Sequence, residues 1–88
     1  MESKALKIFR RKMANPLHWR KANQVFLRYS ETDLQSLERT KHLISTLAAE
    51  LDVPLSPEEK TEAAKWLRAQ GINPQSRMDR MMIWKRAK

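Results

Sequence analysis

The sequence predicts an all-α fold: a small bundle of four to five short helices in a single domain that spans residues 1–88. Helix-forming residues, chiefly Ala, Leu, Lys, Arg, Glu, Gln and Met, dominate the composition. The chain holds 1 Gly and 4 Pro, which leaves little material for hairpins. Its apolar residues, 41% of the total, recur at spacings of three and four and therefore favour amphipathic helices around one small core.

Two basic helices are expected at the N-terminal end, within residues 3–29. The first covers about residues 4–14 and ends before Pro16, because a proline disfavours helical geometry at the residue that precedes it. Asn15 and Pro16 then serve as N-cap and first-turn residue of a second helix, which covers about residues 16–29. In both helices the apolar residues gather on one face, and most of the basic residues lie away from it.

The central helix, about residues 33–51, is the longest of the predicted elements. Its leucine and isoleucine side chains repeat at intervals of three and four, so one broad face is apolar. Thr32 and Gln35 have the spacing of a capping box and are expected to mark its start. The core that these patterns predict draws on Leu34, Leu37, Ile44, Leu47, Leu51, Trp19, Phe26, Ala63, Leu67 and Met81.

Two further helices are expected at the C-terminal end, over residues 56–71 and 76–88. Ser56 is an N-cap residue, a proline occupies the first helical position, and Glu59 can reach back to the Ser56 amide. Gly71 ends this helix, because glycine takes the left-handed C-terminal conformation without strain. A further serine opens the last helix, and the short turns between neighbours predict roughly antiparallel packing.

Charge is distributed unevenly along the chain. Residues 1–29 hold eight Lys or Arg and one acid, whereas residues 30–59 hold two bases and seven acids. Residues 76–88 are again basic, and the formal net charge of the whole chain is +8. A basic head, an acidic middle and a basic tail indicate a protein that meets a polyanion with its two ends.

The leading hypothesis is therefore a small, basic, non-enzymatic accessory or regulatory protein that binds nucleic acid, DNA or RNA, through its N-terminal helices. Such contacts go to phosphates, so they depend on salt and do not read sequence. The residues expected to make them are Lys4, Lys7, Arg10, Arg11, Lys12, Arg20, Lys21 and Arg28. A second basic patch, if the last helix lies near the first, comprises Arg77, Arg80, Lys85 and Arg86.

The start of the second helix offers one specific phosphate site. Helix N-termini carry free amides and a partial positive charge. The amides of Leu17, His18 and Trp19 are expected there, beside the cationic Arg11 and Lys12.

Residues 47–53 resemble the first helix and turn of a helix-turn-helix motif. The helix that follows opens with Glu58 and Glu59, whose carboxylates would repel the phosphates beside a DNA groove. We therefore expect the two ends of the chain, and not this helix, to bind nucleic acid.

The C-terminal helix supports a second hypothesis from another class of function. Met78, Met81 and Met82 face one way, and Ile83 and Trp84 face other sides, so this helix is apolar almost all round. Such a helix either packs in the core or forms an interface: it docks into the groove of a protein partner, as in an adaptor or inhibitor, or against a second copy of the chain. A third interpretation of Trp84 is stacking on a base.

Other functions have little support in the sequence. The chain has no Cys, and its 2 His, His18 and His42, have no ligand set around them, so no metal or other cofactor is expected. A single Gly excludes a glycine-rich phosphate loop, and no enzyme activity is expected. No apolar run has the length of a membrane span, so we expect a soluble cytoplasmic protein. The remaining alternative places the N-terminal helix on an anionic membrane through Ile8 and Phe9.

Overall fold

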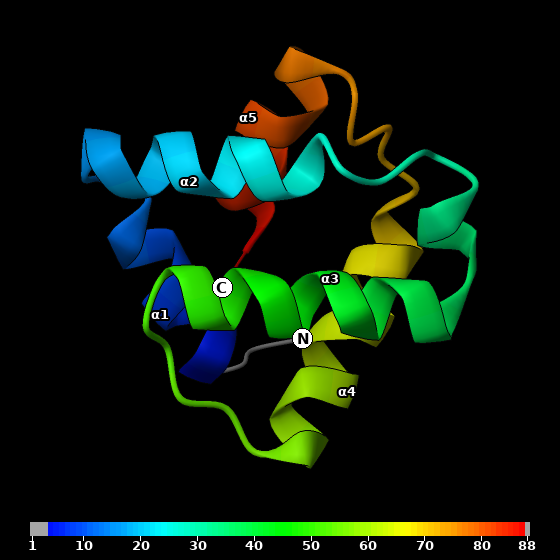
Figure 1. Ribbon diagram of the computed structural model, residues 1–88, viewed down its shortest axis with the longest axis horizontal. Helices are drawn as coiled ribbons and strands as arrows, with labels where there is room; N and C mark the ends of the chain where they lie inside the picture. Colours follow the sequence, from blue (N-terminus) through cyan, green and yellow to red (C-terminus); the bar gives the residue numbers. More distant parts are fainter. Residues whose placement is uncertain (1–3, 88) are drawn as a thin grey trace.

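The computed structural model describes residues 4–87 and has no strand among them, which confirms the predicted all-α class. Within this range, five α-helices and one short 3-10 helix follow one another (Figure 1). Their bounds are α1 (Lys4–Lys12), α2 (Pro16–Phe26), η1 (Asp33–Gln35), α3 (Leu37–Glu50), α4 (Pro57–Gln70) and α5 (Arg77–Arg86).

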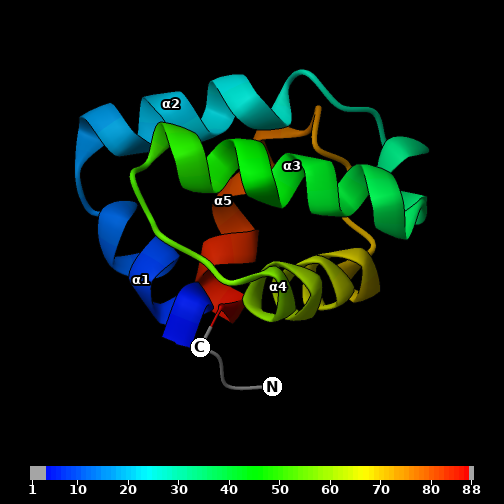
Figure 2. The same cartoon turned by 60° about the horizontal axis from the view of Figure 1, so that its bottom comes forward.

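The helices pack around the C-terminal half of α5. α2 and α3 run side by side in opposite directions, as predicted for helices joined by a short connection (Figure 1). α5 runs inward past α2, and its C-terminal end lies between α1 and α4 (Figure 2). Ile83, Trp84 and Ala87 are buried there, so the last helix is a central element of the bundle.

Both N-terminal helices are shorter than predicted. α1 ends at Lys12, after which the amides of Ala14 and Asn15 bond to carbonyls three residues back. α2 ends at Phe26, and the amide of Tyr29 bonds to the carbonyl of that residue at 3.1 Å. Each helix therefore ends in a tighter turn, in which backbone amides bond to carbonyls three residues earlier, before the chain changes direction.

The start of the central helix was predicted wrongly. Ser36 has an extended backbone, with φ −89° and ψ 126°, and therefore lies outside the helix. Its hydroxyl accepts the Arg39 amide, so α3 begins at Leu37. Thr32 makes no capping hydrogen bond. Several residues of this segment can cap a helix, and the serine that lies next to the long apolar repeat is the one that caps it.

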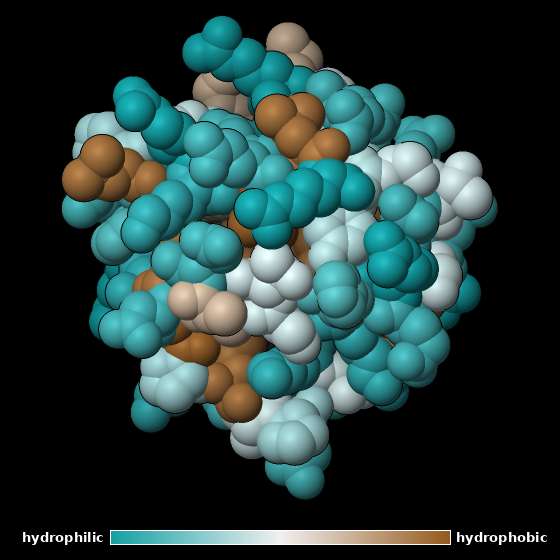
Figure 3. All heavy atoms as spheres, viewed as in Figure 1, coloured by the Kyte–Doolittle hydropathy of each residue, from teal (hydrophilic) through white to brown (hydrophobic). Residues whose placement is uncertain are grey.

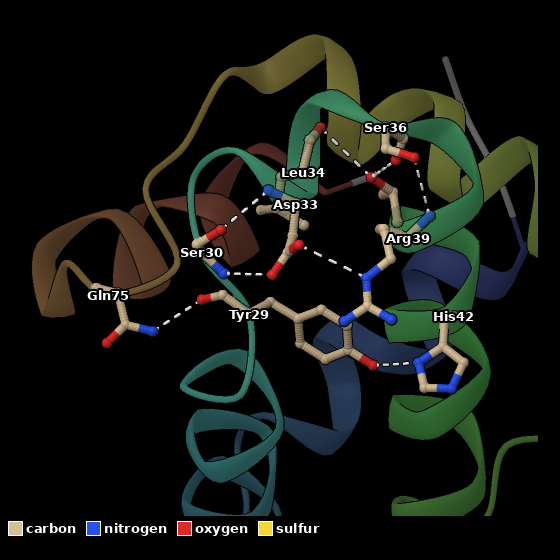
Figure 4. A network of polar contacts seen from close by, with 9 residues as sticks. Tyr29, Ser30, Asp33, Leu34, Ser36, Arg39, His42 and Gln75 are labelled. Atoms are coloured by element: carbon tan, nitrogen blue, oxygen red, sulfur yellow. Dashed lines mark hydrogen bonds and ion pairs between the residues drawn. The ribbon is translucent and has the colours of Figure 1, made fainter.

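The reciprocal cap expected at Thr32 is formed two residues earlier. The Ser30 amide donates to Asp33 Oδ2 at 2.9 Å, and the Asp33 amide donates to Ser30 Oγ at 3.1 Å. This pair opens the 3-10 helix η1 and fixes the connection between α2 and α3 (Figure 4).

A polar network joins the same connection to α3 and to the segment before α5 (Figure 4). The Tyr29 hydroxyl is hydrogen-bonded to His42 Nδ1 at 2.5 Å, and the Arg39 guanidinium carbon lies 5.1 Å from the centroid of the Tyr29 ring. Gln75 Nε2 donates to the Tyr29 carbonyl at 2.8 Å. The end of α2 is therefore held by residues from two other parts of the chain.

The two C-terminal helices follow their predicted signals. Ser56 and Glu59 form both hydrogen bonds of a capping box at the start of α4. Gly71 takes the left-handed conformation at the end of α4, with φ 62°. Ser76 caps α5, which ends at Arg86, whereas the prediction extended it to residue 88, which lies outside the described residues.

The core is mostly the predicted one, with one error in α5. Met81 is 46% exposed, and Ile83 and Trp84 are buried in its place. Trp19 and Leu37 are half-buried and pack against the core without belonging to it. The remaining predicted core residues are buried: Phe26, Leu34, Ile44, Leu47, Leu51, Ala63 and Leu67.

Candidate nucleic-acid interface

The C-terminal helix packs directly on the two basic N-terminal helices. The ring centroid of Trp84 lies 6.2 Å from that of Phe9 in α1 and 5.9 Å from that of Phe26 in α2. These three aromatic side chains are buried, so the contact is part of the core. The basic segments at the two ends of the sequence therefore meet in one half of the molecule, which we call the basic half and define as residues 4–28 and 77–86.

Positive charge in the basic half is almost unopposed. The two segments hold twelve Lys or Arg and a single acid, Asp79. The Asp79 carboxylate accepts the Asn73 amide at 2.9 Å. Within the described residues, the ion pairs within 4.0 Å join Arg39 to Asp33 and Lys41 to Glu38, both outside the basic half.

Most of the predicted phosphate-contacting residues are accessible. Lys12 is half-buried and Arg80 is buried. The other predicted residues are exposed: Lys4, Lys7, Arg10, Arg11, Arg20, Lys21, Arg28, Arg77, Lys85 and Arg86. Arg10 connects the two predicted patches, because its Nη1 donates to the Ala87 carbonyl at 3.4 Å, next to Lys85 and Arg86 in sequence.

Arg80 was predicted as a surface contact, and the structure corrects this. Its side chain is 7% exposed. Nε donates to Asn23 Oδ1 at 2.7 Å, and Nη1 donates to the Pro74 carbonyl at 2.9 Å. Arg80 therefore fastens α5 to α2, and its charge adds to the potential of the basic half without touching a ligand.

The predicted phosphate site at the start of α2 is partly occupied by the protein itself. The Leu17 amide donates to Asn15 Oδ1 at 2.9 Å, and the Trp19 amide donates to the Asn15 carbonyl at 3.0 Å. His18 Nδ1 is bonded to the Lys12 carbonyl at 3.3 Å. Asn15 is a strong cap, so the sequence that begins the helix also uses the amides that were expected to bind phosphate.

The predicted partner interface is also corrected. Met78, Met81 and Met82 are 71%, 46% and 40% exposed, whereas Trp84 is 7% exposed and belongs to the core. Docking of α5 into a partner's groove through Trp84 would uncover Phe9 and Phe26. The membrane alternative meets the same obstacle, because Phe9 is buried.

A groove of about 360 Å³ lies within the basic half. It is lined by Met13, Trp19, Arg77, Met81 and Trp84, which come from the turn after α1, from α2 and from α5. This groove was not predicted from the sequence, in which Trp19 and Met81 were expected to lie in the core. No signal in the sequence indicates that the turn after α1, α2 and α5 meet at one place.

Other kinds of site find no support within residues 4–87. No group of three His, Asp or Glu side chains there could hold a metal ion. No helix in this range combines the length and the apolar character needed to cross a membrane. Glu59 is engaged in the capping box of α4, and Glu58 is exposed beside it, so this helix start remains acidic.

Comparison with family models, with curated proteins and with solved structures gives no match to this chain. The class that the described residues define is an all-α bundle with one strongly basic half.

Proposed function

We propose that this chain is a small, non-enzymatic nucleic-acid-binding protein that contacts phosphates through its basic half. The observation that carries the proposal is the packing of α5 on α1 and α2, through Trp84, Phe9 and Phe26. That packing unites two basic segments that are separated by about half of the chain. A dense field of one sign attracts a polyanion and speeds its encounter with the protein.

The other half of the molecule supports a localised contact. Residues 29–76 hold eight acids and five Lys or Arg, so this half repels phosphates. A nucleic acid would therefore bind on one side of the protein and leave α3 and α4 free. Contacts of this kind release counterions, and the logarithm of affinity falls linearly with the logarithm of salt concentration.

The proposal is tested by binding of labelled duplex DNA, single-stranded DNA and RNA across a salt series. The test variant is Arg11→Glu with Lys21→Glu, both exposed residues of the basic half. The matched control is Lys60→Glu with Lys65→Glu on α4, which changes the net charge by the same amount. We expect salt-dependent binding that the test variant loses and the control variant largely keeps.

Two outcomes would overturn the proposal. One is an absence of binding at about 50 mM salt, where electrostatic contacts to phosphates are strong. The other is an equal loss of affinity in both variants, which would indicate a response to net charge without a defined surface.

The exposed methionines of α5 favour a second candidate function, a protein-interaction module: an adaptor, an inhibitor or a homodimer. Met78 and Met82 have flexible, polarisable side chains that adapt to varied partners. A dimer held by these residues would dissociate when both are changed to Ser, and moderate salt would affect it little. Sedimentation of the wild type and the Met78→Ser/Met82→Ser variant at low and moderate salt distinguishes this candidate.

A further inference from the structure

The groove of the basic half has an unusual lining for a surface hollow. Two indoles, two thioethers and one guanidinium line it: Trp19, Trp84, Met13, Met81 and Arg77. Aromatic and thioether groups favour a flat apolar ring, and a guanidinium favours an anion beside it. By contrast, the face over α2 and α3 is mostly hydrophilic, with hydrophobic residues only in small separate groups (Figure 3).

The surroundings of the groove favour an anionic occupant. Arg77 is exposed, and Arg20 follows Trp19 directly in α2 with an exposed side chain. Lys12, half-buried, precedes Met13 in the turn after α1. Three cations thus lie in or next to the segments that line the groove, and residues 4–28 contain no acid. A ligand that combines flat rings with a chain of negative charges matches this arrangement.

We propose that the groove holds one unstacked base of a single-stranded nucleic acid whose phosphates follow the basic half. The inference rests on the proposed function and narrows it to single strands, because the bases of a duplex are stacked and paired. Stacking on an aromatic side chain tolerates any base, so the contact would select for single strands without selecting a sequence.

The indole nitrogen of Trp84 favours a base over an aliphatic side chain. Trp84 Nε1 is buried and has no hydrogen-bond partner among the described residues. A buried donor without a partner is costly, and a base edge carries carbonyl and ring-nitrogen acceptors that an aliphatic group lacks. Trp84 lines the groove, so a base held there contacts this side chain.

The first test compares oligothymidylate with a sugar–phosphate strand of the same length that carries no bases. Both strands have the same charge, so a purely electrostatic protein binds them equally. We expect the wild type to bind oligothymidylate about 5- to 150-fold more tightly, which corresponds to one stacked base. Trp19→Leu should abolish this preference without changing the salt dependence, and Trp19→Phe, which keeps an aromatic ring, should retain part of it.

The second test uses fluorescence and leaves the groove unchanged. The chain holds 3 Trp, and Trp66 lies in α4 outside the groove. In a Trp66→Phe variant, all indole emission comes from Trp19 and Trp84. We expect oligothymidylate to quench this emission and the baseless strand, at saturation, to leave it nearly unchanged.

The outcomes separate this inference from the proposed function. If neither strand binds, both proposals fail. If both strands bind with equal affinity and neither quenches, the proposed function stands and the base-binding groove is wrong. Preferential binding of duplex over single strands also overturns the inference. Displacement from the groove by an acidic peptide with large apolar side chains, in the absence of any preference for bases, would assign the groove to a protein partner.

Discussion

Arg80 Nε donates to Asn23 Oδ1 at 2.7 Å, and this bond fastens α5 to α2 inside the basic half. The guanidinium also donates a hydrogen bond to the carbonyl of Pro74, in the segment that precedes α5. A cation that sequence analysis assigned to ligand binding therefore has a structural role. Arg77, one helical turn earlier, is exposed and lines the groove. The pair allows a direct comparison of a structural arginine, Arg80, with an arginine that we propose binds a ligand, Arg77.

We predict that Arg80→Ala destabilises the fold by about 2–3 kcal/mol, because it leaves Asn23 Oδ1 and the Pro74 carbonyl without donors. Arg77→Ala should change the free energy of unfolding by less than about 0.5 kcal/mol, as exposed substitutions usually do. Urea unfolding of the two variants measures both values. The same Arg77→Ala variant should bind nucleic acid more weakly than the wild type. Equal stability of the two variants would show that the bonds of Arg80 contribute nothing.

Two residues in the C-terminal half of α5, Trp84 and Met82, are predicted to differ in the same way. Trp84→Ala should destabilise the fold by about 3–5 kcal/mol, because it leaves a cavity between Phe9 and Phe26. Met82→Ala, at a side chain that is 40% exposed, should cost less than about 1 kcal/mol. Thermal unfolding followed by circular dichroism distinguishes the two variants. A small effect of Trp84→Ala would show that Trp84 contributes little to the core, as expected for a residue of a partner interface.

Helix α4 shows which features the sequence could predict. Ser56, Glu59 and Gly71 are local signals whose hydrogen bonds and backbone angles depend on only a few neighbouring residues. Their positions therefore predicted both ends of the helix. The start of α3 shows the opposite case, since the predicted cap residue Thr32 makes no capping hydrogen bond and Ser36 caps the helix.

The orientation of α5 could not be predicted from its sequence. Met81, Ile83 and Trp84 point to different sides, so the apolar pattern does not say which side faces the core. The positive charge of the candidate site could be predicted from the sequence, because its basic residues are consecutive or nearly so in the chain. The groove could not be predicted from the sequence, because its lining residues meet only after α1, α2 and α5 have packed.

Asp33 should make stability depend on pH. The Ser30 amide, the Ser30 hydroxyl and Arg39 stabilise its carboxylate and hold the pKa below its usual value of 3.8, although partial desolvation opposes them. A carboxyl whose pKa is lowered on folding stabilises the protein above its unfolded pKa, and this stability is lost as the pH falls through the folded pKa.

We therefore predict that Asp33→Asn unfolds at lower urea concentration than the wild type at neutral pH. The difference should begin to narrow as the pH falls below about 4 and close as it falls through the folded pKa. Urea midpoints measured from neutral to acidic pH test this expectation. Thr32→Ala is the control, because Thr32 makes no capping hydrogen bond and lies next to Asp33. A difference between wild type and Asp33→Asn that stays constant at all pH values would contradict the assigned role.

Substitutions at Gly71 measure the free-energy cost of a left-handed backbone conformation without a steric clash. Its φ is +62°, and a Cβ built at this position meets no atom within 4 Å. A substitution there is therefore strained by the backbone conformation alone and not by a steric clash. We predict that Gly71→Ala lowers the free energy of unfolding by about 1–2 kcal/mol. Gly71→Asn should cost less, since asparagine tolerates this conformation better.

Urea unfolding of Gly71→Ala and Gly71→Asn compares the two effects at one site. The Gly71 amide donates to the Arg68 carbonyl at 3.3 Å, and both variants keep that backbone donor, so this bond does not distinguish them. Equal losses in the two variants would mean that a crowded environment, and not the backbone angle, determines the preference for glycine. The larger loss for alanine would identify the left-handed cap as the reason why α4 ends at this residue and the chain turns towards α5.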